Sequence, residues 1–136
     1  MNHHVAYIAG IIDGEGSIVL SKKRKTARFR TPVVSVSSTT LEILEYLRSH
    51  YGGSISKHKV YQEHHKQSWS WKLDYGRAIR LCMDVLPYLL EPEKRRRAQL
   101  LVDVYGCVTV RNGKYTPKQL EAKEAFEHEF LHPSTA

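Results

Sequence analysis

The stretch that decides the fold lies near the N-terminus and runs Ile8-Ala9-Gly10-Ile11-Ile12-Asp13-Gly14-Glu15-Gly16. Residues 4–15 are rich in Ile, Ala and Gly, a composition that suits either a buried strand or a buried helix. A helix is favoured because small residues recur at every fourth position and so share one helical face. These residues are Ala6, Gly10 and Gly14, and Gly16 follows as a residue whose conformational freedom can end the helix.

The acidic residues of this stretch lie where a helix disfavours them. Asp13 and Glu15 come at the C-terminal end, which carries the negative pole of the helix dipole. A bound cation would relieve that cost, and paired carboxylates suit Mg²⁺, which prefers oxygen ligands. The small-residue face allows the backbone of a second helix to approach closely. If that helix belongs to a second copy of the chain, a two-fold axis between the copies would bring their Glu15 side chains together. The alternative interpretation, a polar helix end followed by a glycine turn, fits the same residues.

The rest of the chain is predicted to alternate between hairpins and helices. Strands are predicted at 17–23, 29–37, 54–61 and 68–74, and helices beginning near 39 and 116 and spanning about 77–90 and 93–105. Capping boxes are predicted at Thr39-x-x-Glu42 and at Thr116-Pro117-x-Gln119. Two hairpins can form one antiparallel sheet with helices on its apolar face. With no repeat and no linker, we expect an α+β fold in a single domain of residues 1–136.

Three single positions carry further expectations about packing. Pro32 suits an edge strand or a bulge better than an interior strand. Cys82 falls on an apolar helical stripe and is predicted to lie in the core. The last helix is predicted to bury an apolar stripe made of Ala122, Phe126 and Phe130.

The charge balance indicates an acidic partner. The chain has 21 Lys and Arg against 14 Asp and Glu, a formal net charge of +7, and its basic residues cluster at 22–30 and 94–97. Clustered positive charge favours nucleic acid, although many basic proteins bind nothing specific. We find no apolar run of about 18 residues and no signal-peptide pattern. Two cysteines cannot form a disulfide framework. We therefore expect an intracellular protein, in a bacterial cytoplasm or an organelle, with no membrane partner.

Residues 8–16 resemble the signature motif of the LAGLIDADG homing endonucleases. The identical positions are Ala9, Gly10, Ile12, Asp13 and Gly16. Ile8 and Ile11 replace leucine, Gly14 replaces alanine, and Glu15 replaces the second aspartate while keeping a carboxylate. The following Ser17-Ile18 and the order of elements extend the resemblance over about residues 5–105, which leaves about 106–136 as a C-terminal helical extension.

The resemblance implies the α-β-β-α-β-β-α fold of that family, with a saddle-shaped antiparallel sheet and helices on one face. It implies an intron-encoded, site-specific endonuclease that cuts both strands of double-stranded DNA at a long, near-palindromic target. Because the sequence holds a single motif, the resemblance implies a homodimer that uses Mg²⁺, or another divalent cation such as Mn²⁺. The motif helices of two chains would then meet through Ala6, Gly10, Ile11 and Gly14.

The resemblance also implies catalytic roles, position by position. Glu15, together with Gly14, is the implied metal-binding position, and Asp13 is implied to stabilise the helix end beside it. Lys94 is the best match to a basic residue that this family places beside the scissile phosphate. Ser38 stands at the end of the second strand, where the family often has a longer polar side chain that orders water. That position departs from the pattern.

DNA-contacting residues are predicted from strand alternation, opposite the face that carries the apolar side chains. The apolar face is predicted to hold Ile18, Leu20, Val34, Val36, Trp69 and Trp71. The predicted DNA-contacting set is Ser21, Lys23, Lys25, Arg28, Arg30, Val33, Ser35, Ser37, Ser56, His58, Ser68, Ser70, Lys72, Arg95 and Arg96. A β-ribbon fits the major groove, and each of these residues is as apt to contact phosphate as a base.

Two other functions compete with this hypothesis. One is a non-cleaving nucleic-acid binder on the same fold, either an intron-splicing maturase or a transcription factor, against which the retention of Glu15 and Lys94 argues. The other is a metal-dependent histidine nuclease suggested by His64-His65 after Glu63. No second metal-binding half with suitable spacing follows that pair, so this hypothesis is disfavoured.

Overall fold

The computed structural model describes residues 3–60, 66–111 and 114–133. The elements in chain order are α1 (His3–Glu15), β1 (Gly16–Ser21), β2 (Thr31–Ser38), α2 (Leu41–Tyr51), β3 (Ser54–Lys57), β4 (Trp69–Asp74), α3 (Tyr75–Val85), a 3-10 turn (Leu86–Tyr88), α4 (Pro92–Leu100), a π-helical turn (Leu101–Tyr105), α5 (Gly106–Val108) and α6 (Pro117–Leu131). The pair His64-His65 lies outside the described residues. No helix within these ranges is both long and apolar enough to span a membrane.

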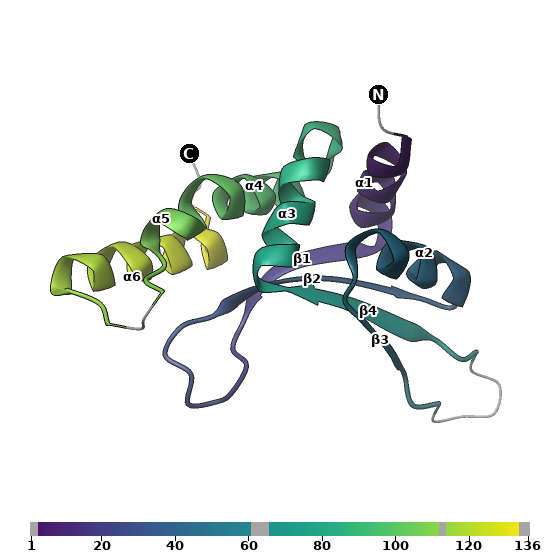
Figure 1. The fold of residues 1–136 in the computed structure, drawn as a ribbon, viewed down its shortest axis with the longest axis horizontal. Coiled ribbons are helices and arrows are strands. Elements are labelled where there is room, and N and C mark those ends of the chain that lie inside the picture. Colours follow the sequence, from purple (N-terminus) through teal and green to yellow (C-terminus); the bar gives the residue numbers. More distant parts are fainter. Residues whose placement is uncertain (1–2, 61–65, 112–113, 134–136) are drawn as a thin grey trace.

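The strands form one antiparallel sheet in the order β1-β2-β4-β3. The predicted hairpins are therefore joined through their second strands, β2 and β4. Figure 1 shows the helices on one side of the sheet, while the β1–β2 connection bends away from them toward the opposite side. The predicted α+β architecture, with helices on a single face, is confirmed, and the other face of the sheet stays open.

The core fills the space between the sheet and the helices. Its sheet side is supplied by the alternate residues of each strand, and its helix side by α1, α2, α3 and α4. Trp71 is fully buried at the centre, and its indole Nε1 donates to the Gly52 carbonyl at 2.8 Å. The neighbouring Gly53 has φ +91°, and a Cβ there would lie 2.5 Å from the Lys72 carbonyl oxygen. Only glycine fits that position, which explains why the chain turns there from α2 into β3.

The predicted capping boxes differ in their outcome. The one at Thr116 is confirmed, because Thr116 Oγ1 accepts from the Gln119 backbone N–H at 3.2 Å and the Gln119 side chain accepts from the Thr116 N–H at 3.0 Å. The one at Thr39 is wrong. Helix α2 begins after Thr40, so Glu42 falls one position too early to reach back to the cap.

The predicted roles of Gly16 and Pro32 need correction. Gly16 does not adopt the left-handed conformation, and it opens β1. Its lack of a side chain matters because a Cβ would lie 2.8 Å from the Cα of Ile12. Pro32 lies in β2, which is an interior strand. It is tolerated there because the ladder to β4 begins only at Val33, so Pro32 is paired on one side alone.

The later helices are more broken than predicted. The helix expected over 77–90 ends at Val85 and continues as a 3-10 turn, and the one expected over 93–105 changes into a π-helical turn after Leu100. Cys82 is in the core as predicted, where burial raises the pKa of its thiol to about 12. In α6 the predicted apolar stripe is wrong at one position, since Ala122 is exposed and Lys123 is buried with 1% of its surface accessible.

Candidate active site and nucleic-acid interface

The C-terminal end of α1 is fixed by the side chain of Asp13. Its two carboxylate oxygens accept from the Leu90 backbone N–H at 3.1 and 3.0 Å, and Oδ1 also accepts from the Glu91 N–H at 3.0 Å. These N–H groups precede α4, so Asp13 joins the end of α1 to the beginning of α4. Its oxygens are already hydrogen-bonded, which fits the supporting role predicted for this residue.

Lys94 completes the same junction from the other side. The side chain of Glu91 caps α4 by accepting from the backbone N–H of Glu93 and of Lys94. One turn of helix then places the Lys94 ammonium against α1, where Nζ donates to the Ile12 carbonyl at 2.9 Å and the Asp13 carbonyl at 2.8 Å. The ammonium thereby satisfies terminal carbonyls and opposes the negative pole of the helix dipole. Of its three N–H donors, these carbonyls take two.

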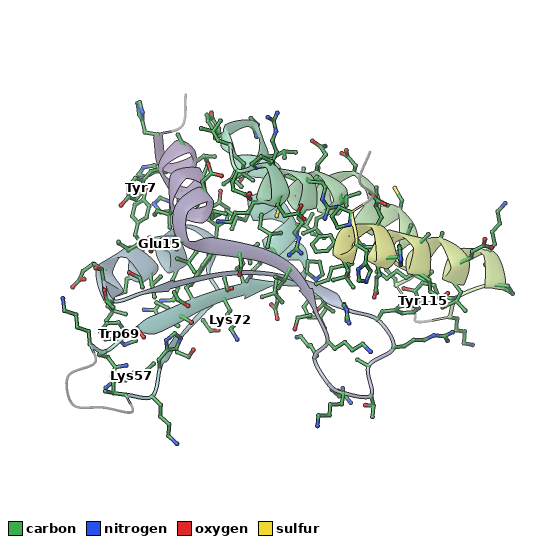
Figure 2. The ribbon with its side chains drawn as sticks, turned by 180° about the vertical axis from the view of Figure 1, so that it is seen from behind. Tyr7, Glu15, Lys57, Trp69, Lys72 and Tyr115 are labelled. Atoms are coloured by element: carbon green, nitrogen blue, oxygen red, sulfur yellow. The ribbon has the colours of Figure 1, made fainter. Side chains whose placement is uncertain are left out.

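Glu15 is the last residue of α1 and its carboxylate is exposed. Figure 2 shows it where α1 meets the sheet. Glu15 helps to line a shallow groove of about 400 Å³ that also includes Gly14 and Tyr7. Within the described ranges, no three His, Cys, Asp or Glu side chains gather closely enough to hold a metal ion.

The donor set at this place nevertheless suits a hard cation. One chain offers the Glu15 carboxylate and the backbone carbonyl of Gly14, both oxygen ligands of the kind that Mg²⁺ prefers. Asp13 is engaged with backbone N–H groups, so the remaining oxygens of a magnesium site must come from water, from a phosphate or from a second chain. The residues present fit half of such a site.

The small-residue face of α1 lies open at Gly10 and Gly14, beside Ile43 of α2. Gly10 and Gly14 are exposed, and a Cβ built on either meets nothing within 4 Å. Tyr7 on the same side is 54% exposed, whereas Ile8 and Ile12 on the other side are fully buried. The predicted set of Ala6, Gly10, Ile11 and Gly14 therefore lines one open groove.

The open face of the sheet carries a ladder of serines. Ser17 and Ser35 share a hydrogen bond of 2.7 Å between their hydroxyls, and so do Ser37 and Ser70. The strand register also places Ser35 beside Lys72, whose side chain is exposed. These polar groups from β1, β2 and β4 lie together, opposite the core face, as the alternation predicts.

His58 extends this polar surface beyond the end of β3. Its ring nitrogens bond to the hydroxyls of Ser68 and Ser70, at 2.8 and 2.5 Å. Ser70 is itself 8% exposed, because Ser37 and His58 both cover it. Three of the predicted residues of the second hairpin, His58, Ser68 and Ser70, are therefore linked by hydrogen bonds rather than presented separately.

No protein-family model matches the sequence, and no curated protein is significantly similar to it. The structure is similar over 96% of the chain to the archaeal intron-encoded homing endonuclease I-Vdi141I complexed with DNA, with 22% identity, a TM-score of 0.68 and 84% of that chain covered. It is similar over 97% of the chain to the homing endonuclease I-CvuI in complex with its target, with 17% identity, a TM-score of 0.69 and 82% of that chain covered. For the LAGLIDADG homing endonuclease I-SmaMI bound to cleaved DNA, the identity is 22%, the TM-score is 0.67, and 99% of this chain spans 46% of the other.

The chain has the LAGLIDADG homing endonuclease fold. This confirms the fold that the motif at residues 8–16 implied. At these identities the likeness establishes the architecture, and the roles of individual side chains in the LAGLIDADG fold remain predictions for this chain.

Not every predicted DNA-contacting residue lies on the open face of this LAGLIDADG fold. The guanidinium of Arg96 donates to the Glu129 carbonyl at 3.0 Å and to the Phe130 carbonyl at 2.7 Å, and so caps the end of α6. It also pairs with Glu93, whose carboxyl pKa is lowered by that hydrogen bond. These internal contacts argue against a DNA contact by Arg96, whereas its neighbour Arg95 is exposed on α4.

Ser38 is likewise engaged locally. Its hydroxyl accepts from the Thr40 backbone N–H at 3.0 Å, at the beginning of α2. The neighbouring Ser37 is bonded to Ser70. Neither short side chain replaces the longer polar group that the LAGLIDADG pattern often has at this point.

Sequence reasoning missed two contributors to the site. Glu91 caps α4 and thereby positions Lys94; the signal was present, because an acceptor residue directly before a proline is typical of a helix start. Tyr7 flanks the small-residue groove, and no sequence pattern marks it, since an aromatic residue next to Ala6 fits a buried helix equally well.

Proposed function

We propose that this chain is one half of a site-specific endonuclease that cleaves double-stranded DNA as a homodimer by divalent-metal-dependent hydrolysis. The observation that carries the proposal is the construction of the α1 end. Asp13 and Lys94 hold that end through hydrogen bonds to backbone groups, while Gly14 and Glu15 are exposed beside an open groove. The Lys94 ammonium offsets part of the negative pole of α1, and the exposed Glu15 carboxylate adds a negative charge at the same end, so the arrangement favours a further cation there.

Glu15 and Gly14 would hold the metal, with the matching oxygens of the partner chain. When bound, a divalent cation acidifies water and stabilises the oxygen that leaves phosphorus. Lys94 is oriented by the Ile12 and Asp13 carbonyls and has one N–H left for a phosphate oxygen or the attacking water. That donor would stabilise negative charge that develops on the phosphate during attack.

The homodimer follows from the incompleteness of one chain. A single Glu15 supplies one carboxylate, and the groove beside it is lined by Gly10 and Gly14, which permit close approach of a second helix. A two-fold axis through this face would place both Glu15 side chains at the centre of the assembly. The open sheet faces of the two chains would then lie in one line, each facing half of the DNA target.

The open sheet face supplies the DNA contacts in this proposal. Serine hydroxyls can both donate and accept, so the ladder at Ser35, Ser37 and Ser70 can exchange its internal hydrogen bonds for base edges or water. Lys72 and the basic connection at 22–30 add the phosphate contacts on which affinity mostly depends.

A selection from randomised duplex DNA tests this function. In the presence of Mg²⁺, the protein is expected to enrich duplexes that are cut in both strands at one position, with a near-palindromic consensus around the cut. A consensus without two-fold symmetry would contradict the homodimer. Enriched binding without any cleavage would contradict the endonuclease.

The second candidate, a non-cleaving nucleic-acid binder on the same fold, is favoured by one observation. The residue at the end of β2 is Ser38, whose side chain is short and whose hydroxyl already accepts from the Thr40 N–H. A chain without a water-ordering side chain there would keep its DNA-binding face but would cleave slowly or not at all. The same selection distinguishes the candidates, since a non-cleaving binder would leave every duplex uncut.

A further inference from the structure

The connection between β1 and β2 is attached to α6 at its C-terminal end, where the chain enters β2. Within this connection the six basic residues of 22–30 are concentrated. The backbone N–H of Arg30 donates to Glu127 Oε2 at 3.1 Å, across 97 positions of sequence. Glu127 lies on α6, so the C-terminal helix holds the point where the basic connection enters β2.

A second attachment is aromatic. The rings of Phe29 and Tyr115 lie 4.9 Å apart between centroids, and the Tyr115 hydroxyl accepts from the Val110 backbone N–H at 3.2 Å. Figure 2 shows Tyr115 beside α6, on the side that faces the β1–β2 connection. Phe29 is therefore packed against a side chain that is itself hydrogen-bonded to the C-terminal segment.

Lys123 is the centre of this attachment and is the buried residue that the helical pattern of α6 did not predict. Only 1% of the surface of Lys123 is exposed. Its ammonium donates to Thr109 Oγ1 at 2.6 Å. The same nitrogen lies 4.3 Å from the ring centroid of Tyr105 and 5.7 Å from that of Phe29. Burial lowers the pKa of this ammonium, and the charge of Glu127 partly opposes that change. A buried cation needs such compensation.

The other end of the connection is held by the sheet. Lys23 lies just after β1, pairs with Asp74 at 3.3 Å, and places its ammonium 4.1 Å from the ring centroid of Tyr75. Tyr75 has φ +53°, a left-handed conformation that is unusual for an aromatic residue. The basic connection is thus anchored where it leaves β1 and where it enters β2.

We propose that α6 and the segment before it are a positioning element for DNA recognition, in which Glu127 and Lys123 hold the return of the β1–β2 connection in one orientation. The exposed side chains that this would present are those of Lys25 and Arg28, with Arg30 beside the anchor. The inference rests on the proposed DNA-binding function, and it gives the C-terminal extension a specificity-determining role.

The physical reason is the cost of ordering. Neighbouring like charges repel one another, and each long basic side chain that DNA immobilises loses conformational entropy. A connection that is already anchored at both ends loses less on binding, so affinity and discrimination both improve. Glu127 acts through the Arg30 backbone, which makes it a positioning residue.

The test compares Glu127→Ala with Glu127→Gln, which keeps an acceptor oxygen, and with Glu124→Ala, a matched charge loss on an exposed position of α6. Hydrogen–deuterium exchange without DNA is expected to be about tenfold faster over residues 22–31 in Glu127→Ala alone, the effect of losing one hydrogen bond to a charged acceptor. Binding to a duplex obtained by selection should weaken about tenfold, with reduced discrimination among duplexes carrying single base-pair changes. The cleavage rate at saturating DNA should be unchanged.

Two results would overturn the inference. One is equal exchange over 22–31 in Glu127→Ala and Glu124→Ala. The other is faster exchange with unaltered affinity and discrimination, which would make the contact structural only. Failure of the proposed function looks different, because the unsubstituted protein would then enrich no duplex in the selection while the exchange difference persisted.

Discussion

Replacement of Lys94 by methionine is expected to lower both stability and cleavage rate, by separable amounts. The ammonium donates to the Ile12 carbonyl at 2.9 Å and to the Asp13 carbonyl at 2.8 Å. A hydrogen bond to a charged group contributes about 1.5–3 kcal/mol, and a cation at a helix C-terminus about 0.3–1 kcal/mol. Because Lys94 is half-buried and water can replace part of these contacts, we expect a loss of about 1.5–3 kcal/mol in the free energy of unfolding.

The effect on cleavage has a different origin. If the remaining N–H stabilises charge on the phosphate, its loss should slow single-turnover cleavage on the order of 10²-fold. Binding should weaken by no more than about threefold, since one phosphate contact among several is lost. Urea denaturation followed by circular dichroism measures the first effect, and quenched-flow cleavage with a filter-binding titration measures the second.

Lys118→Met is the matched control, because Lys118 is exposed near the beginning of α6. It should change the free energy of unfolding by less than about 0.5 kcal/mol. Unfolding of Lys94→Met that matches this control would contradict the stabilising role of the ammonium at the end of α1. An equal fall in binding and in cleavage would contradict the role in the cleavage step and make Lys94 a phosphate-binding residue only.

Two further predictions concern the uncovered helix face and the buried lysine. Gly10→Leu should fill the groove beside α1 and shift the sedimentation coefficient from that of a dimer to that of a monomer. Gly76→Leu is the control, because Gly76 has similarly open space around it but lies on α3, and it should leave the dimer intact. A dimer in both variants would contradict pairing through α1. Burial lowers the pKa of Lys123, so between that lowered pKa and the ordinary 10.5 the unfolded chain binds more protons than the folded one. The free energy of unfolding, measured relative to Lys123→Met, should therefore rise as pH increases through this window, and a difference independent of pH would contradict the burial of a charged ammonium.

The architecture was predictable from sequence because its signals are local and periodic. Small residues every fourth position gave α1, and alternation of valine with serine gave β2 and its two faces. The motif at residues 8–16 supplied the fold family. Each of these patterns belongs to a single helix or strand, so it can be recognised without knowing what that element packs against.

The parts that could not be predicted depend on distant partners. The ammonium of Lys94 reaches carbonyls 81 and 82 positions away, and no periodicity marks a side chain that caps another helix. The helical stripe of α6 does not include Lys123, since lysine is seldom buried, and the aromatic rings and the Thr109 hydroxyl around it are what make its burial tolerable. Arg96 was grouped with its basic neighbours, although the end of α6 takes its donors.

The central claim is that Glu15 provides the cation site for phosphodiester cleavage. The most direct measurement is single-turnover cleavage of the selected duplex in Mg²⁺ by Glu15→Gln, alongside binding to the same duplex and alongside Glu121→Gln as an exposed control on α6. Glu15→Gln is expected to bind as tightly as the unsubstituted protein without cutting, while Glu121→Gln should both bind and cut. Undiminished cutting by Glu15→Gln would contradict the claim.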